Sequence, residues 1–515
     1  MSRLLARRVG HLPQRSTVTT APRLITARTT TVPIRALAMT TRTNPTAALA
    51  NKRLNVVATW LSAPKNQMST TVSSAEASLA EVLTRKNGNV REIVLNRPKK
   101  LNALNLNMVK SIYPELQAWE KSDTAKIVVL KSCGGKGFCA GGDVKTVVDL
   151  AAEGKQEEAV AFFEEEYKLD YFIGTMKTPY VSIMDGITMG GGVGLSVHAP
   201  FRIATENTLF AMPETGIGFL PDVAGSFFLP RLDGKLGIYL GLTGKRLSGV
   251  DAFYAGIATH YVPSSRVDAL VERLSELNTS DLDVINTAIE EFSADMVNEA
   301  PFSLGGDVRA AIDRCFGHNT VEEIVAALEK EDSEWAKETL KLMSRVSPTS
   351  LKIALRQLHN GAGYTLGQCF KMEFHLVQKF LEGHDFAEGV NAVLGKEKKK
   401  ANWQPASLAE VDDARIKFQY FDSASKLRLN LDGRKDYKEY PHRKYMLPSE
   451  EEIKAVVTGE VPSVGQYALN EKEVVDFFLR ERNNKQGVQQ KVTEVLQRKT
   501  KVISKDEHDS LKWQY

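Results

Sequence analysis

The chain has 515 residues, of which 43% are apolar and 25% charged, a composition typical of a folded globular protein with about two or three domains. The formal net charge of +4 is uneven, because residues 1–53 hold nine Arg, one Lys and no acid, and the remainder is mildly acidic. The mildly acidic charge of the chain after residue 53 argues against broad binding of nucleic acid. The four cysteines lack zinc-ligand spacing and favour free thiols in a reducing compartment, and no apolar run reaches the ~18 residues of a membrane helix.

The N-terminal segment is typical of a targeting sequence. Residues 1–45 are rich in Arg, Ser and Thr, and the first acidic residue of the chain is Glu76. An Arg-rich, acid-free leader without a long apolar stretch predicts a mitochondrial transit peptide and a matrix location, with a disordered basic tail as the alternative. Residues 46–78 are interpreted as a linker.

After this leader, short apolar strands alternate with glycine-rich turns and helices. Residues 80–95 predict a hairpin around Asn87-Gly88, a strong turn signal. Further elements follow in chain order: a helix at 107–121, a strand at 126–131, a strand at 179–185, a helix after the glycine-rich turn at 186–194, and strands at 201–205 and 208–212. The alternation predicts an α/β fold, and apolar residues at helical spacing over 321–343 and 351–358 predict a helical region behind it.

The composition changes near residue 400, where a charged run precedes a more polar segment. We therefore divide the chain into a main domain at 79–400 and a mostly helical extension at 401–515, with helices expected at 470–480 and 486–497. The extension holds 20 Lys and Arg against 19 Asp and Glu, so only local basic pieces such as Arg443-Lys444 and Arg498–Lys501 favour contact with an anionic partner.

Three loops carry residues suited to chemistry. Gly134–Asp143 is a glycine-rich loop that can aim backbone N–H groups at an anion or a carbonyl, although a tight structural turn explains it equally well. The Gly190–Gly192 triplet stands at a strand-to-helix junction, where three glycines are costly; close helix packing or a backbone donor at the helix end would compensate. The Gly/Pro-rich loop 212–222 holds Glu214 and Asp222, and a lone acid in such a loop is more often a cap or a solvated charge.

In this order and spacing the motifs resemble the crotonase (enoyl-CoA hydratase/isomerase) superfamily. The loop FCAGGD at 138–143, the glycine triplet and PE at 213–214 follow its pattern, and the resemblance covers about residues 80–400. Strings such as GITMGGGVGLSVH at 186–198 and FAMPETGIGFLPD at 210–222 look like its 3-hydroxyisobutyryl-CoA hydrolase branch. The resemblance implies a spiral of ββα units, a C-terminal helical region and members that usually form oligomers.

The resemblance also implies roles for individual residues. Backbone N–H groups of Cys139 and Gly191 would form an oxyanion hole for a thioester carbonyl, which gains negative charge when attacked. Glu214 would be either the nucleophile or the general base, and Asp222 would orient water or move a proton. Glu166, which by itself looks like part of a solvated helix face, would bind the 3-hydroxyl group of the substrate, so that the predicted substrate-binding set is Glu166, Gly191, Glu214 and Asp222.

The implied activity is hydrolysis of 3-hydroxyisobutyryl-CoA and similar short 3-hydroxyacyl-CoA thioesters, as in valine catabolism. Coenzyme A would be part of the substrate, and we expect no separate cofactor or metal. Hydratases of the superfamily carry a second catalytic glutamate where this chain has Gly194, and a glycine transfers no proton. The resemblance therefore favours hydrolysis over hydration.

The alternative is a structural protein built on this scaffold. Long fungal-type members with a C-terminal extension resemble a protein of the mitochondrial ribosome's small subunit, which residues 401–515 would then contact. An oligomerisation arm or a disordered tail is the other interpretation of the extension. Both roles are compatible in one chain.

Overall fold

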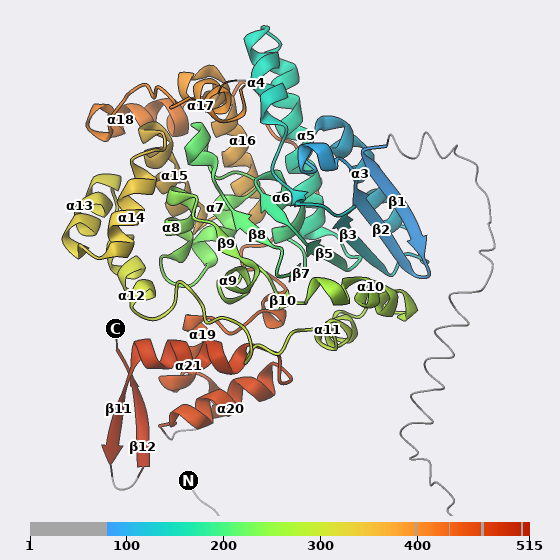
Figure 1. Cartoon of the computed structure of the whole chain (residues 1–515), viewed down its shortest axis with the longest axis vertical. Coiled ribbons are helices and arrows are strands. Elements are labelled where there is room, and N and C mark those ends of the chain that lie inside the picture. Colours follow the sequence, from blue (N-terminus) through green and yellow to red (C-terminus); the bar gives the residue numbers. More distant parts are fainter. Residues whose placement is uncertain are drawn as a thin grey trace, which may run out of the picture. The chain divides into compact units, whose positions relative to one another are not determined.

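Strands of two sheets alternate along the first part of the chain. A computed structural model describes residues 80–514, apart from 396, 398, 432, 465–467 and 506–507, and the predicted leader and linker lie outside these residues. The larger sheet has the strand order β1-β2-β3-β5-β7-β10 and the smaller has β4-β6-β8-β9 (Figure 1). In three consecutive pairs, β3/β4, β5/β6 and β7/β8, the first strand joins the larger sheet and the second the smaller. This is the spiral of ββα units that the resemblance implies.

The strands are short, as the apolar runs predict. Their bounds are β1 Val82–Asn87, β2 Val90–Leu95, β3 Ile127–Ser132, β4 Gly137–Cys139, β5 Tyr180–Met184, β6 Ile187–Met189, β7 Phe201–Ala204, β8 Leu209–Ala211, β9 Leu247–Ser248 and β10 His260–Tyr261. The predicted hairpin is confirmed, since β1 and β2 pair antiparallel with Asn87 opposite Val90. Gly88 takes φ 54°, which a residue with a side chain adopts at a cost.

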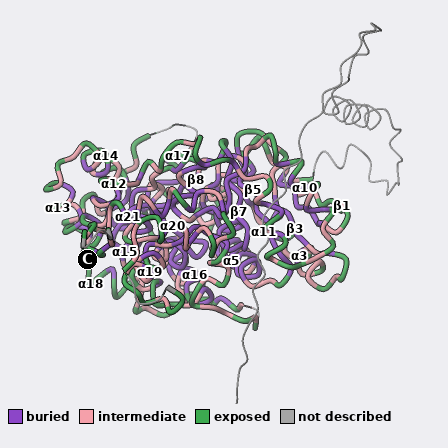
Figure 2. Tube along the Cα trace, turned by 90° about the horizontal axis from the view of Figure 1, so that it is seen from below, coloured by how far each residue is buried: buried purple, intermediate pink, exposed green. Residues whose placement is uncertain are grey.

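The larger sheet is buried on both faces, which explains its continuous apolar strands. Val128 and Leu130 of β3 face α3 and α5, while Ile127 and Val129 face α10 and α11. Figure 2 shows β5 and β7 in the buried middle of the molecule, whereas β1 lies at its rim and is partly exposed. The helices of this part are α3 Leu106–Glu120, α4 Val144–Ala152, α5 Gln156–Thr175, α6 Gly191–Val197, α7 Gly225–Phe228, α8 Leu236–Thr243, α9 Gly249–Tyr254, α10 Val267–Glu276 and α11 Leu282–Glu290.

A helical region follows, with α12 Gly306–Cys315, α13 Val321–Glu331, α14 Glu334–Met343, α15 Pro348–Gly361, α16 Leu366–Glu382 and α17 His384–Leu394. The apolar pattern over 321–343 is divided between α13 and α14. Asp332 adopts a left-handed conformation with φ 47° and ends α13, and the Ser333 side chain caps α14. Within the described residues no helix is both long and apolar enough to cross a membrane.

The extension consists of α18 Asp413–Ile416, α19 Glu450–Val457, α20 Glu471–Glu481, α21 Val488–Lys499 and a hairpin of β11 Thr500–Lys505 and β12 His508–Trp513. The two predicted helices correspond to α20 and α21, whereas the hairpin was not expected. Its base is apolar, and Leu511 and Trp513 pack into the same cluster as Phe253 and Tyr254 of the main domain. Figure 1 shows the rest of the hairpin standing away from the helices.

Buried ion pairs join the extension to the main domain. Lys491 lies 2.7 Å from Asp233, and Lys485, which is 4% exposed, contacts Glu290. Glu450 of α19 contacts both Arg309 and Arg498. All described residues belong to one compact unit, so the extension is an integral part of it.

Candidate active site

A cavity of about 350 Å³ opens between the two glycine-rich loops and α5. Its wall includes the backbone of residues 140–142 and 189–191, the aromatic rings of Phe162 and Phe163, and the carboxyl groups of Glu166, Glu214 and Asp222. The structure therefore brings together the three acids that the sequence analysis singled out. Val393 and Leu394 at the end of α17 form an apolar part of the wall.

A larger cavity of about 740 Å³ lies between the main domain and α19. Two of its acids, Asp233 and Glu450, are paired with cations of the extension or of α12. Because these acids are neutralised by cations, they are not suited to catalysis. The smaller cavity is therefore the candidate site. Among the residues that the structure describes, no group of His, Cys, Asp and Glu has the arrangement of a metal site.

The glycines at the start of α6 are required by carboxyl groups that lie against them. A Cβ atom added to Gly190 would stand 3.2 Å from Oε1 of Glu214, and one added to Gly191 would stand 2.4 Å from Oε1 of Glu166. At Gly194 the added atom would stand 2.3 Å from Oδ2 of Asp170. Close approach thus compensates for the low helix propensity of glycine. A side chain at 194, such as the glutamate of hydratases, has no room.

Two backbone N–H groups beside this turn are free to bind a carbonyl oxygen. Gly191 begins α6, whose first N–H groups have no partner within the helix. The nitrogen of Gly142 lies 3.3 Å from the Cβ position of Gly191, and neither N–H has an acceptor among the described residues. The N–H of Ala140 is already donated to the carbonyl of Leu101.

Cys139 does not line the cavity. It is fully buried in β4, and its carbonyl oxygen would be 2.2 Å from a Cβ atom on Gly192. Burial raises the pKa of its thiol to about 12, so the thiol stays protonated. The cavity wall from this loop is formed by Ala140, Gly141 and Gly142 instead.

The acids at the site are buried and form no ion pair with a described residue, although Arg246 also lines the cavity. Glu166, Glu214 and Asp222 are 2%, 5% and 5% exposed, and none of them forms an ion pair within the described part of the chain. Burial raises the pKa of Glu214, and the charge of Asp222 raises it further. Burial also raises the pKa of Asp222 to about 7, although the hydrogen bond from Tyr167 opposes this rise. One carboxylate and one carboxylic acid can therefore coexist here near neutral pH.

A hydrogen bond and a strained loop together fix the position of Asp222. The hydroxyl group of Tyr167 donates to its Oδ2 at 3.0 Å. The next two residues, Val223 and Ala224, are both left-handed, with φ 52° and 58°, which is costly for residues other than glycine. Glu373 of α16 accepts hydrogen bonds from the backbone N–H groups of Ala224 and Ser226, at 2.7 and 2.9 Å, and so fixes this conformation.

The sequence analysis missed Tyr167, Asp170 and Glu373. Glu166 itself is buried, unlike the solvated helix face that its neighbours suggest, whereas Glu165 does pair with Lys168 on the partly exposed side of α5. The available signal was helical spacing, because Asp170 follows Glu166 by four residues and therefore shares its face. Nothing local in the sequence points to Glu373.

The chain is similar in sequence to known proteins of one family. A family model described as enoyl-CoA hydratase/isomerase matches residues 90–421. The small ribosomal subunit protein mS47 of Neurospora crassa is 45% identical over 423 residues, covering 78% of this chain and 82% of that protein. Human mitochondrial 3-hydroxyisobutyryl-CoA hydrolase is 48% identical over 318 residues, covering 62% of this chain and 82% of the hydrolase.

Solved structures give the same result. A carnitinyl-CoA dehydratase from Mycobacterium thermoresistibile has a TM-score of 0.62 and 36% identity, covering 69% of this chain and 99% of its own. An enoyl-CoA hydratase from Rhodobacter sphaeroides has a TM-score of 0.60 and 32% identity, covering 66% and 97%. The chain therefore belongs to the enoyl-CoA hydratase/isomerase family and has the α/β crotonase fold.

Proposed function

We propose that this protein is a component of the small subunit of the mitochondrial ribosome, built on an acyl-CoA hydrolase fold whose catalytic site is retained. The observation that carries the ribosomal role is the length of the match to the Neurospora ribosomal protein. That match covers 78% of the chain, which is more than residues 90–421 can hold, whereas the human hydrolase match covers 62%. Similarity to the ribosomal protein thus extends beyond the hydrolase fold.

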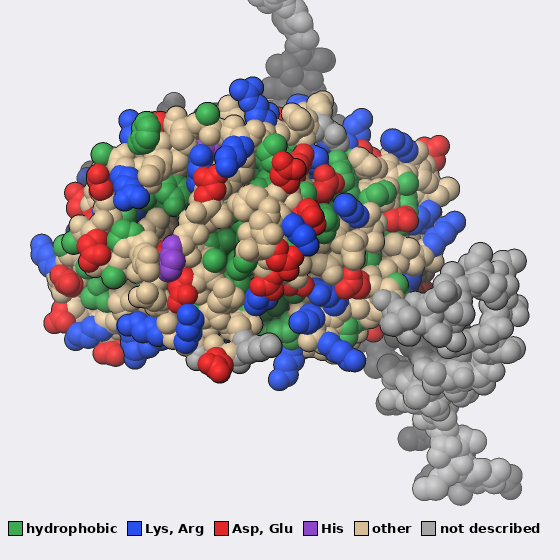
Figure 3. Space-filling view, turned by 90° about the horizontal axis from the view of Figure 1, so that it is seen from above, with side chains coloured by type: hydrophobic (Ala, Val, Ile, Leu, Met, Phe, Trp, Pro, Cys, Tyr) green, Lys and Arg blue, Asp and Glu red, His purple; other side chains and the backbone are tan. Residues whose placement is uncertain are grey.

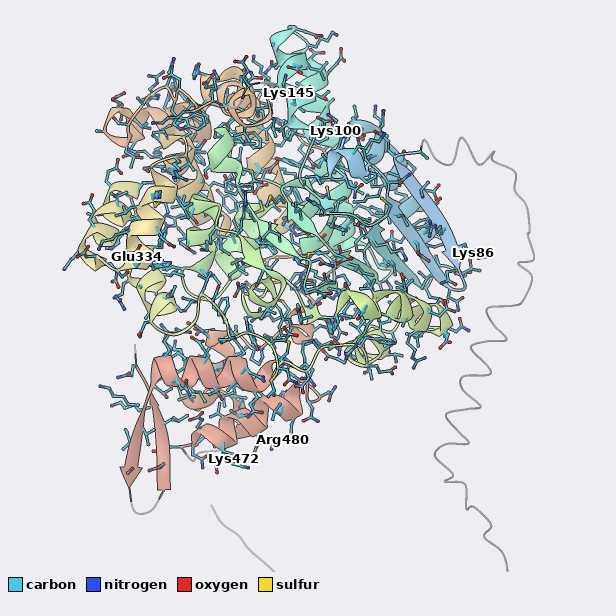
Figure 4. All side chains as sticks on the ribbon, in the orientation of Figure 1. Lys86, Lys100, Lys145, Glu334, Lys472 and Arg480 are labelled. Carbon is cyan, nitrogen blue, oxygen red and sulfur yellow. The ribbon has the colours of Figure 1, made fainter. Side chains whose placement is uncertain are left out.

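The contact with the ribosome is local rather than a broad basic surface. Figure 3 shows acidic and basic side chains interspersed over the visible face. The basic pieces of the extension suggested by the sequence are largely occupied, because Arg443 pairs with Glu452, Lys444 with Asp283, and Arg498 is buried against Glu450. Among the described residues of the extension, exposed side chains suited to a partner include Arg480 of α20, which is labelled in Figure 4, and Lys501 and Val502 of the hairpin.

Sedimentation of a mitochondrial lysate tests the ribosomal role. The protein is expected in the gradient fractions of the small subunit, and the variant Glu214→Gln is expected there in equal amount, because Glu214 is buried in the main domain. Assay of CoA release in each fraction would show whether activity accompanies the ribosome. Recovery of the protein in the light fractions alone would end this proposal.

The retained site supports hydrolysis of a short 3-hydroxyacyl-CoA, such as 3-hydroxyisobutyryl-CoA, in the mitochondrial matrix. The carbonyl oxygen would bind the N–H groups of Gly191 and Gly142, which replaces the Cys139 donor expected from the sequence. Glu214 would add to the thioester carbon and form an anhydride that water then hydrolyses, or it would take a proton from the water that adds to this carbon. Asp222 would carry the proton that the CoA thiolate takes up when the C–S bond breaks. Glu166 would accept a hydrogen bond from the 3-hydroxyl group.

Two assays of the purified protein test this second role. Release of CoA from 3-hydroxyisobutyryl-CoA is expected to exceed hydration of crotonyl-CoA, since Asp170 leaves no room for a catalytic side chain at 194. The Glu214→Gln protein provides the inactive control. Faster hydration than CoA release by the wild type would contradict the hydrolase assignment.

A further inference from the structure

Asp170 is a buried carboxyl group that the proposed reaction does not use. It lies on α5 one helical turn after Glu166 and is 0% exposed. Neither of its oxygens has a hydrogen-bond partner, and no cation pairs with it within the described residues. A buried acid without partners destabilises a fold, and nothing structural is gained in return. Such a group beside a reactive cavity points to a role in the chemistry.

The carboxyl group occupies a defined place behind the oxyanion donor. Glu166 lies against Gly191 at the cavity wall, and Asp170 lies against Gly194, three residues further along α6. Successive turns of α5 thus present two carboxyl groups to the first turns of α6. The hydroxyl group of Tyr180, also buried without a partner in the described residues, lies close enough for Asp170 to affect its ionisation.

A negative charge on the carboxyl groups beside α6 would affect the proposed reaction. The proposed oxyanion forms at the N–H of Gly191, so a negative charge on Glu166 or Asp170 would oppose it. Two carboxyl groups in one unsolvated space cannot both ionise near neutral pH. Among the described residues, the titratable groups that face Asp170 are all neutral or acidic: Glu166 on α5, Cys139 on β4, Tyr180 on β5, Asp222 in the loop 212–222 and Glu373 on α16.

We propose that Asp170 is a positioning residue of the hydrolase site, which carries a proton beside Gly194 on α6 and keeps the negative charge near the oxyanion low while it forms. This role rests on the proposed hydrolase function. At alkaline pH Asp170 loses its proton to solvent, and the added negative charge weakens binding of the oxyanion. Ionisation of Asp170 therefore adds to the decline of turnover at alkaline pH.

The variant Asp170→Asn tests this role, because asparagine keeps the shape of the side chain and cannot ionise. Its kcat and KM are expected within about threefold of the wild type at pH 7, while the alkaline decline of kcat/KM moves up by about one pH unit. Glu165→Gln, on the partly exposed side of the same helix, is the matched control and should leave the profile unchanged. Coincident profiles of wild type and Asp170→Asn would overturn the proposal.

Unfolding in denaturant at several pH values separates this proposal from the hydrolase assignment. The wild type should lose stability relative to Asp170→Asn as pH rises from 5 to 9, because Asp170 is protonated in the folded chain and ionised in the unfolded chain. Equal pH dependence of the two proteins would overturn the role of Asp170 whatever the activity. Divergent stability combined with no CoA release by the wild type would overturn the hydrolase function, and the positioning role with it.

Discussion

The candidate active-site cavity and the junction between main domain and extension both bury several acids, but they do so in opposite ways. At the cavity Glu214 and Asp222 form no ion pair with any described residue, and burial raises the pKa of each. At the junction burial opposes ionisation in the same way, but Lys491 and Arg443 lower the pKa of Asp233 to about 2. Lys485 likewise keeps the pKa of Glu290 low.

This difference separates two uses of buried charge. Acids paired with cations hold two parts of the chain together, and their removal leaves a charge unpaired. Acids without cations cost stability and are kept where they can exchange protons with a substrate. The same substitution should therefore have opposite consequences in the two regions, which the following experiments test.

The largest effect is expected for Glu214→Gln. Loss of the reactive carboxylate should lower kcat roughly a thousandfold, as for removal of a general base or nucleophile, while CoA-thioester affinity changes little. The unfolding free energy should be equal or higher, since a costly buried acid is gone. CoA-release kinetics and calorimetric binding measure the two quantities. Turnover within tenfold of the wild type would remove Glu214 from the mechanism.

Glu290→Gln makes the same chemical change at the junction. Lys485 would remain buried without its partner, so the unfolding free energy should fall by about 3 kcal/mol, while kcat/KM stays near the wild-type value. Urea titration provides the measurement. The double variant Glu290→Gln with Lys485→Met should recover much of the loss, because neither charge remains. No loss in the single variant would mean that this pair does not hold the extension.

A pair of aspartate variants separates the regions by pH. The pKa of Asp222 in the folded state is raised to about 7. Its contribution to stability is therefore lost as pH rises from about 4 to 7. At pH 8 the Asp222→Asn protein should be about 2 kcal/mol more stable than the wild type. The pKa of Asp233 is lowered, so its contribution to stability is present above about pH 4 and is lost on acidification. At pH 8 the Asp233→Asn protein should be less stable than the wild type by a similar amount. Effects of the same sign at pH 8 would refute the contrast.

The smallest effect is expected for Tyr167→Phe. This change removes the hydrogen bond to Asp222, so the pKa of Asp222 rises further and kcat should fall about fivefold to tenfold. The limb of the pH–rate profile that reports Asp222 should move to higher pH. Tyr171→Phe, one turn further along α5, serves as the control. An unmoved profile would show that Tyr167 does not tune this acid.

The local pattern of the sequence predicted the strands and the two glycine-rich loops, because apolar runs and turn residues report directly on backbone conformation. It did not predict that Asp170 and Glu373 face the site, since burial of an acid depends on helices that pack from distant parts of the chain. The donor expected at Cys139 was assigned by resemblance, whereas the structure places this residue behind the cavity wall.

The end of the extension was harder to predict for a different reason. Residues 500–513 alternate polar and apolar side chains over a short span, and Lys501 stands directly opposite Lys512. Like charges opposite one another disfavour a hairpin, so propensity gives a weak signal there. Only the packing of Leu511 and Trp513 against the helices accounts for the strand pair.

The buried lysines of the extension have a consequence for synthesis of the protein. Glu290 and Asp233 meet their cations only when residues 485 and 491 have been made. Until then the two carboxylates stay unpaired, and the apolar residues that pack against α20 and α21 stay uncovered. We therefore expect the main domain to reach its full stability only after residue 491 has been synthesised.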